Sequence, residues 1–348
     1  MTRRHRLAYN RGPRPWPGNL SRRKQLPHDA IFPAVPDKHP ANMTALIATS
    51  VVRGSRQGDS HGGVYLVDLD GQRVKQTVDW NHADIDWQGR GWDRGLRGIA
   101  FDGNRVFIAA SDELFAYTPD FELLASYRSP YLKHCHEISG YQRRLYLTST
   151  GFDSILGFDL DRNRFSMGLH IARAEEHFDV SPYDPADKRG PAAANRLHIN
   201  SVYCNSEGMF ISGLHTEGLL RFDGRRAELV ASLPRGAHNA RPFLDGMLFN
   251  DTQANVVRFV AAKRQRAFNI PRYAEQQLTH TELDDSRIAR QGFGRGLCII
   301  NEHLVAAGSS PSTITLHDLD SMKTTLRINL TMDIRNAIHG LELWPYPL

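Results

Sequence analysis

The sequence predicts an all-β fold, and three observations carry this prediction. From residue 43 onward, short segments of alternating apolar and polar residues are separated by Gly, Asp and Asn turns. This alternation is typical of half-buried strands, and helical periodicity is almost absent from the same region. The segments also recur in units of similar length, which indicates a repeat architecture.

Five complete units follow one another along the chain. They begin at Arg97, His136, His198, His238 and Arg295. Each unit reads as four strands, an inner, a second, a third and an outer one, joined by short turns. The spacing is regular, since 14 residues separate both Arg97 from Ser111 and His136 from Thr150. Four strands per repeat are typical of a β-propeller blade.

A sixth blade is divided between the two ends of the repeat region. The segment 338–348 (IHGLELWPYPL) matches only an inner strand, whereas 44–52, 62–71 and 73–80 match only the second, third and outer strands. We expect the C-terminal strand to pair beside the N-terminal three and so to close the ring, which removes two exposed sheet edges. The sequence therefore predicts a six-bladed β-propeller over residues 43–348.

Residues 1–42 differ in composition from the rest of the chain. They hold nine Lys and Arg against two Asp, a charge of +7, which leaves −2 for the remainder because the whole chain carries +5. They also contain seven of the 18 prolines. Such a segment buries little apolar surface, so we expect an extended or disordered tail. The folded body is not basic, which argues against a nucleic-acid-binding protein.

Signals for membranes and secretion are missing from the sequence. No apolar run approaches the roughly 18 to 20 residues of a membrane span, and the N-terminus has no apolar core of a secretory signal. The three cysteines, Cys135, Cys204 and Cys298, contain no CxxC pair, so neither a disulfide framework nor a zinc ribbon is indicated. We expect a cytoplasmic protein without membrane contacts, and its oligomeric state stays open.

The heads of the six inner strands are the candidate functional residues, because in a propeller they face one another across the central channel. Read round the ring they are His339, Arg97, His136, His198, His238 and Arg295. Neutral imidazole binds Fe, Zn, Mn and Cu, and four such ligands leave coordination positions open for a substrate. The pattern predicts one divalent metal held by the four histidines, with Arg97 and Arg295 binding an anionic substrate. The alternative is a metal-free polar channel that binds an anion.

Further groups are expected on the same face of the propeller. The loops after second strands carry His215, Asn250 and Asp251, which we expect to contact the substrate. Glu137 follows His136 directly, and strand alternation points it away from the channel, where it would orient a neighbouring metal ligand from behind. The long connections at 79–96, 170–196 and 271–293 are also expected there, and long loops on one face usually build a binding site or lid.

Four motifs resemble a known group of proteins. They are KHCHEIS, YLTSTGFDSI, LHINSV and AHNARPF, and they resemble an uncharacterised bacterial propeller family, described only as a domain of unknown function, in the NHL and gluconolactonase-like superfamily. The resemblance covers residues 43–348 and implies a six-bladed propeller. It does not imply a reaction, because propellers host many chemistries.

Two characterised families are similar in their metal geometry. Carotenoid cleavage oxygenases hold a non-haem Fe(II) with four channel histidines on seven blades. Peptidyl-hydroxyglycine lyases combine channel histidines on zinc with a substrate-binding arginine on six blades. The resemblance implies that His136, His198, His238 and His339 are ligands and that Arg97 or Arg295 binds an anion. The blade count departs from the first family and the four-histidine set from the second.

The expected function is that of a metal-dependent enzyme. Four neutral ligands without a carboxylate favour Fe(II) over Zn, Mn or Cu, and the reaction would be that of an oxygenase or of a lyase or hydrolase acting on a small anionic substrate. The alternative function is a non-catalytic propeller that binds an anionic ligand or a protein partner. We expect no nucleic acid among the partners.

Overall fold

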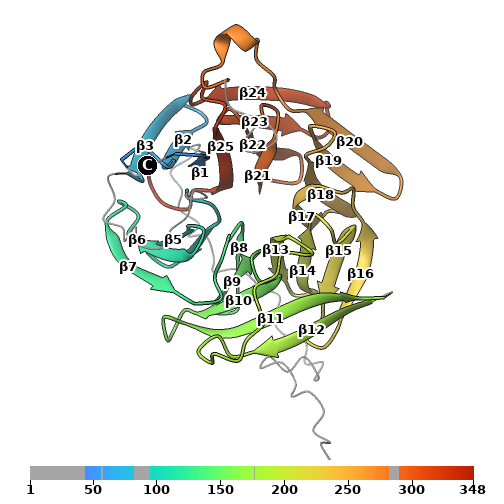
Figure 1. Ribbon diagram of the computed structural model, residues 1–348. Helices are drawn as coiled ribbons and strands as arrows, with labels where there is room; N and C mark the ends of the chain where they lie inside the picture. Colours follow the sequence, from blue (N-terminus) through green and yellow to red (C-terminus); the bar gives the residue numbers. More distant parts are fainter. Residues whose placement is uncertain (1–43, 56–57, 82–94, 176, 282–289) are drawn as a thin grey trace, which may run out of the picture.

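The computed structural model describes residues 44–55, 58–81, 95–175, 177–281 and 290–348. The predictions made for the tail 1–42 lie outside these residues. Within them the fold is a β-propeller, with blades arranged in a ring around a central axis (Figure 1). This confirms the all-β prediction, since the helical part of the described chain is one 3-10 turn, η1 (Glu275–Gln277). None of the described helical residues forms a segment that could cross a membrane.

Four blades are separate four-stranded antiparallel sheets. One of these blades contains β4 (Ile99–Asp102), β5 (Arg105–Ala109), β6 (Glu113–Tyr117) and β7 (Leu123–Arg128). Another contains β17 (Ala237–Phe243), β18 (Gly246–Asp251), β19 (Val256–Ala261) and β20 (Arg264–Asn269). The next contains β21 (Gly294–Ile299), β22 (Leu304–Ser309), β23 (Thr313–Asp318) and β24 (Lys323–Asn329).

The remaining separate sheet closes the ring as the sequence predicts. Its strand order places β25 (Asn336–Leu343) on the inside, followed by β1 (Ala45–Val52), β2 (Gly63–Asp68) and β3 (Arg73–Asp79). In Figure 1 the red β25 lies beside the blue β1 at the channel. The antiparallel pairing runs from Leu46 opposite Leu343 to Val52 opposite Asn336. The closing strand is buried over most of its length, so it belongs to the core of the ring.

Two blades are joined into one nine-stranded sheet. The first has β8 (Ile138–Tyr141), β9 (Arg144–Ser149), β10 (Ser154–Asp159) and β11 (Arg164–Ala174), and the second has β13 (Ile199–Asn205), β14 (Gly208–Gly213), β15 (Gly218–Phe222) and β16 (Ala227–Ser232). The extra strand β12 (His177–Tyr183) pairs with β11 along seven positions and meets β16 only at Phe178 and Ala227. The sequence analysis treated 170–196 as a connecting loop, which is wrong for this part. Alternating residues in HFDVSPY fit a partly exposed strand.

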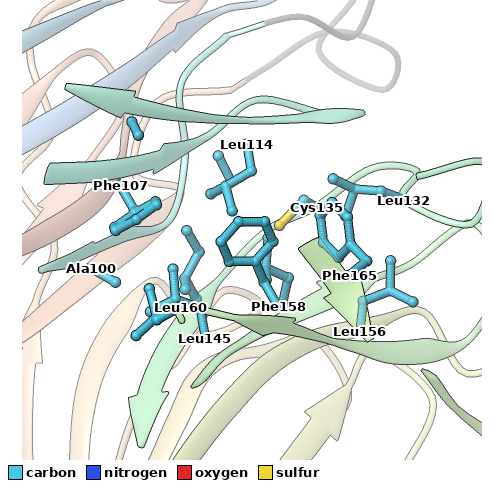
Figure 2. Packing of buried hydrophobic residues seen from close by; sticks show 14 of the residues in the cluster. Ala100, Phe107, Leu114, Leu132, Cys135, Leu145, Leu156, Phe158, Leu160 and Phe165 are labelled. Carbon is cyan, nitrogen blue, oxygen red and sulfur yellow. The ribbon is translucent and has the colours of Figure 1, made fainter. Parts of the chain in front are cut away.

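Apolar side chains of neighbouring blades pack against one another and fix the ring. Between the β4–β7 blade and the β8–β11 blade, Phe107 and Leu114 meet Leu145, Leu156 and Phe158 in one buried cluster (Figure 2). The outer strands are mostly exposed, as β7 shows. Burying a side chain of this size stabilises the fold by about 1.5–3 kcal/mol, so these contacts hold the inner strands at fixed distances around the channel.

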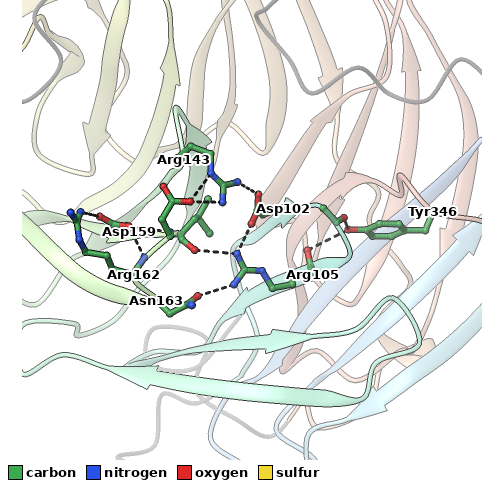
Figure 3. Close-up of polar contacts among 10 residues, drawn as sticks. Asp102, Arg105, Arg143, Asp159, Arg162, Asn163 and Tyr346 are labelled. Atoms are coloured by element: carbon green, nitrogen blue, oxygen red, sulfur yellow. Dashed lines mark hydrogen bonds and ion pairs between the residues drawn. The ribbon is translucent and has the colours of Figure 1, made fainter.

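The blade ends opposite the strand heads are tied by polar contacts (Figure 3). Arg143, in the turn after β8, pairs with Asp102 of the preceding blade and with Asp161. Arg105 donates to Asn163 Oδ1 at 2.8 Å, across the same blade junction. The hydroxyl of Tyr346, beyond β25, donates to the carbonyl of Gly103 at 2.6 Å. Exposed pairs of this kind contribute about 0–1 kcal/mol each, so they set the register between blades more than they stabilise the fold.

Candidate functional site at the channel mouth

The six predicted head residues come together at one end of the channel. Five of them are buried, and His198 is half-buried. The imidazole of His136 has its ring centre 5.1 Å from that of His339, 5.6 Å from that of His198 and 6.4 Å from that of His238. Both arginines contact the same imidazole, since Arg97 Nη1 and Arg295 Nη1 each lie 3.4 Å from a ring nitrogen of His136. We call these six side chains the His/Arg ring.

Irregular pairing of the inner strands brings several ring members to this level. In β25 the residue His339 has no partner in β1, because Thr49 pairs with Gly340 and Ser50 with Ile338. In β21 the register shifts between Gly294 and Leu297, which places Arg295 inside the irregularity. An inserted residue of this kind bends a strand and redirects a side chain. The local backbone therefore turns these side chains toward the mouth.

Gly340 allows β25 to approach the neighbouring blade closely. A Cβ atom at this position would lie 2.1 Å from the carbonyl oxygen of Arg97 and 2.5 Å from Thr49 Oγ1. Thr49 Oγ1 donates to that same Arg97 carbonyl at 2.5 Å and accepts from the Gly340 amide at 2.9 Å. Any side chain at position 340 would force these strands apart, so this glycine fixes His339 beside Arg97.

Backbone hydrogen bonds to side chains position His136 and His198. Thr148 Oγ1 accepts from the amides of His136 and Glu137, at 2.9 and 3.1 Å. Asp153 accepts from the amides of Arg196, Leu197 and His198, at 2.6, 3.1 and 2.9 Å. A carboxylate that binds three successive amides orders the chain where it enters β13. His198 has a φ of +55° there, a conformation that this ordered segment has to support.

The four histidines of the ring are neutral at pH 7. Burial lowers the pKa of His136, His238 and His339 well below the ordinary value, and the pKa of His198 to about 4. The charge of Arg295 lowers all four pKa values further, and the charge of Arg97 lowers those of His136, His198 and His339. Neutral imidazoles can donate one hydrogen bond and accept one. The ring thus combines two guanidinium charges with four neutral groups that are able to bind a ligand.

The tautomers of two imidazoles follow from their contacts. His238 Nδ1 lies 3.0 Å from the carbonyl oxygen of Gly236, which can only accept, so Nδ1 carries the proton and Nε2 the lone pair. His339 Nε2 lies 2.7 Å from Arg295 Nη1, which can only donate, so the proton of His339 is on Nδ1. Both remaining nitrogens, His238 Nε2 and His339 Nδ1, are buried and have no hydrogen-bond partner.

His136 cannot satisfy both arginines. Its Nε2 faces Arg97 and its Nδ1 faces Arg295, each at 3.4 Å, and a guanidinium offers donors only. Since a neutral imidazole has one lone pair, one of these two contacts sets an N–H group against another N–H group. An acceptor oxygen placed between the two groups would relieve this conflict.

A second polar layer lies behind the ring. Glu137 Oε1 pairs with Arg241 Nη2 at 2.9 Å and accepts from Asn239 Nδ2 at 3.3 Å, and its Oε2 accepts from Ser201 Oγ at 2.7 Å. Burial, partly offset by Arg241, raises the pKa of the nearby Glu342 to about 7. A cavity of about 10 Å³ is lined by residues of both layers, among them His136, His339, Glu137 and Glu342. It admits about one water molecule and no larger ligand.

The structure places the other predicted site residues as follows. The contacts of Glu137 run to Arg241, Asn239, Ser201 and the Val202 amide, and none of these is a ring histidine, so its role in orienting a metal ligand stays a prediction. Asn250 Nδ2 donates to Asn239 Oδ1 at 3.0 Å and so supports the second layer. Asp251 pairs with Arg258 at 2.8 Å. His215 is half-buried and close enough to His198 to lower its pKa.

The sequence analysis missed a cationic cluster beside the ring. The guanidinium carbons of Arg295, Arg290 and Arg53 lie 4.7, 5.5 and 5.6 Å from the ring centre of Phe293, which also contacts His238 edge-on at 5.7 Å. Guanidinium groups favour aromatic faces at such distances. The signal was available, since Arg290, Phe293 and Arg295 lie within six residues of sequence at the end of a long connection. Arg53 could not be found in this way, because it lies near the beginning of the repeat region, far from Arg290 in sequence.

The ring nitrogens do not converge on a metal position. Within the part of the chain that the structure describes, no group of three or more His, Cys, Asp or Glu side chains could hold a metal ion. Arg295 Nη1 lies between His136 Nδ1 and His339 Nε2, at 3.4 and 2.7 Å, and its charge would repel a cation placed there. The side chains as they stand do not fit a metal on the channel axis. The metal centre stays a prediction, and it requires Arg295 to leave this position.

Comparisons with known proteins support the fold. The chain matches a structure of the nidogen/laminin complex with a TM-score of 0.53 at 10% identity, over 87% of this chain and 98% of the other. It matches a protein of unknown function from Bacteroides caccae with a TM-score of 0.52 at 10% identity, over 87% and 99% of the two chains. No family model and no curated protein sequence matches. The class that fold and comparisons define together is the β-propeller.

Proposed function

We propose that this propeller binds a small anion at the mouth of its channel, on the outer side of the His/Arg ring. The observation that carries the proposal is the convergence of two guanidinium groups, Arg97 and Arg295, on one neutral imidazole. Guanidinium N–H groups form strong hydrogen bonds to carboxylate and phosphate oxygens. An oxygen of the anion would also accept from the His136 N–H that faces a donor.

The surroundings of the ring favour an anion as well. Arg53 and Arg290 lie around Phe293 next to Arg295, and several like charges at the rim of a partly desolvated site raise the local concentration of anions. His339 Nδ1 adds a buried donor without a hydrogen-bond partner. In this proposal the ligand is held without a metal, by hydrogen bonds and charge. The three described cysteines are free thiols, which supports a reducing compartment such as the cytoplasm.

Calorimetric titration of the protein after treatment with a chelator tests this function. We expect succinate and sulfate, both dianions at about pH 8, to bind saturably. Arg97→Met and Arg295→Met should each weaken binding by about 2 kcal/mol, roughly thirtyfold, since each removes a charged hydrogen-bond donor. Arg143→Met is the matched control, because Arg143 pairs with Asp102 and Asp161 at the opposite ends of the blades. Equal affinities in all four proteins would contradict the proposal.

A metal-dependent oxygenase or lyase is the second candidate. The observation in its favour is the lone pair of His238 Nε2, which is buried without a hydrogen-bond partner among three further imidazoles. His136, His198, His238 and His339 would hold the ion, and a bound ion would supply Lewis-acid or redox chemistry. Elemental analysis of untagged protein beside a His198→Ala/His238→Ala double variant separates the candidates. We expect no stoichiometric metal in either protein, and iron, zinc, manganese or copper lost only in the variant would favour the enzyme.

A further inference from the structure

We infer that the anion bound at the His/Arg ring carries one O–H donor in addition to its charged oxygens, and that this hydroxyl donates to His238 Nε2. The inference rests on the proposed function and deepens it by defining the chemistry of the ligand. The ligand class is an oxyanion with a protonated oxygen, either a hydroxycarboxylate or a singly protonated phosphate.

Most of the groups that the ring presents to a ligand are donors. Arg97 and Arg295 have donors only, His339 presents a buried Nδ1–H without a hydrogen-bond partner, and one N–H of His136 faces a guanidinium. An anion that offers acceptor oxygens alone would satisfy all of these groups. Such an anion, for example sulfate or a simple carboxylate, would match this part of the ring well.

His238 is the exception, because its open position is an acceptor. The carbonyl of Gly236 at 3.0 Å fixes the proton on Nδ1, and Thr252 Oγ1 donates to the same carbonyl at 2.7 Å, which holds that oxygen in place. The lone pair on Nε2 therefore stays on the far side of the imidazole. His238 is 3% exposed and this nitrogen has no hydrogen-bond partner.

A lone pair in this position discriminates between ligands. An anion without a proton would set one of its oxygens against the lone pair of Nε2 or leave this buried acceptor unsatisfied, and both are unfavourable. An anion with one hydroxyl would satisfy the acceptor and the donors together. A site built to hydrogen-bond a hydroxyl rejects the analogue that lacks it more strongly than an apolar pocket rejects an added group.

Two matched pairs of probes test the inference and separate the two sources of the hydroxyl. Malate differs from succinate by one hydroxyl group, and hydrogen phosphate carries one O–H that the tetrahedral sulfate ion of similar size lacks, while both members of each pair are dianions at about pH 8. We expect the hydroxyl-bearing member of at least one pair to bind about tenfold more tightly to the unmodified protein, by calorimetry. A preference in the malate pair assigns a hydroxycarboxylate, and a preference in the phosphate pair assigns a phosphate.

The variant His238→Phe tests the assigned acceptor. It should reduce the preference to about one, because it removes both the acceptor for the hydroxyl and the repulsion of an unprotonated oxygen. His317→Phe is the matched control, since His317 is also buried but bonds Thr315 and Thr324, both within its own blade. The His317→Phe variant should keep the preference for the hydroxyl-bearing probe. If a phenylalanine variant does not fold, His238→Leu replaces it, because leucine also lacks an acceptor, and the comparison of probes on the unmodified protein needs no variant.

The possible outcomes distinguish failure of the inference about the hydroxyl from failure of the proposed anion site. Equal binding within both pairs would overturn the inference and leave the proposed anion site standing. A preference that survives in His238→Phe would overturn the assignment of the acceptor. No saturable binding of any of the four probes would overturn the proposed function, and the inference with it.

Discussion

Replacing Arg241 by methionine is expected to lower the free energy of unfolding by about 3–5 kcal/mol, because removing one partner of a buried ion pair leaves an uncompensated charge. Arg241 and Glu137 are each 8% exposed and pair at 2.9 Å behind the His/Arg ring. The remaining bonds of Glu137, to Ser201 and Asn239, would not neutralise its charge. Denaturant unfolding monitored by fluorescence measures the effect.

Two further variants test whether burial of the Arg241–Glu137 pair causes the expected loss of stability. Arg264→Met removes an exposed pair with Asp245 and should cost less than about 1 kcal/mol. The double variant Glu137→Gln/Arg241→Met should recover part of the loss, because no unpaired charge stays in the interior. If Arg241→Met costs no more than Arg264→Met, the second polar layer does not have the role described here.

Acid is expected to destabilise the metal-free protein strongly between about pH 6.5 and pH 4. The pKa of His198 and that of His317 are lowered to about 4, mainly by burial, and those of His136, His238 and His339 are well below the ordinary value. A histidine with a lowered pKa in the folded state takes up its proton only on unfolding. Its contribution to stability is therefore complete above the unfolded pKa and is lost as the pH falls toward the folded pKa.

The size of the acid effect follows from the number of protons. Each such histidine reduces the free energy of unfolding by up to about 1.4 kcal/mol per pH unit within its window. Glu342 acts in the opposite sense, because its pKa is raised to about 7 in the folded state, so the folded protein binds a proton there between about pH 7 and pH 4.5. Glu342 therefore offsets the contribution of about one histidine to the pH dependence of the free energy of unfolding.

Urea unfolding at a series of pH values measures this slope. His317→Gln should reduce the slope by about one proton, and it lies outside the His/Arg ring, so it reports burial alone. His198→Asn should reduce the slope similarly within the ring. A free energy of unfolding that stays constant from about pH 6.5 to pH 5 would show that the buried histidines already carry protons in the folded state.

The fold could be predicted from sequence because strand alternation and the repeat spacing are local signals. The division of the first blade between β1–β3 and β25 followed from counting which strands each end lacked. The extra strand β12 was missed, since its alternation HFDVSPY lies inside a segment rich in turn residues and only contacts with β11 and β16 make it a strand. Tertiary pairing decides such borderline segments.

The clustering of the strand-head residues could be predicted from the sequence, but their hydrogen bonds could not. The register of the repeats was sufficient to bring His136, His339 and Arg295 together. It could not give the contact of both arginines with His136, because side-chain conformation depends on bulges and on neighbouring blades. Arg241, the partner of Glu137, lies three residues after His238 on a strand with an irregular register, and strand alternation alone does not predict where it points.

The pairing of β25 with β1 has a consequence for the order of folding. The amide of Gly340 bonds the side chain of Thr49 across 291 residues of chain, and contacts of such long range form slowly because a large loop has to close first. Until then the inner edge of β1 is open to pairing with other chains. The residue before Gly340 is His339, so the step that closes the ring also brings the last imidazole to the channel mouth. An open ring is therefore prone to aggregation, and under the proposed function it is also unable to bind the anion, so that anion binding would report completed folding.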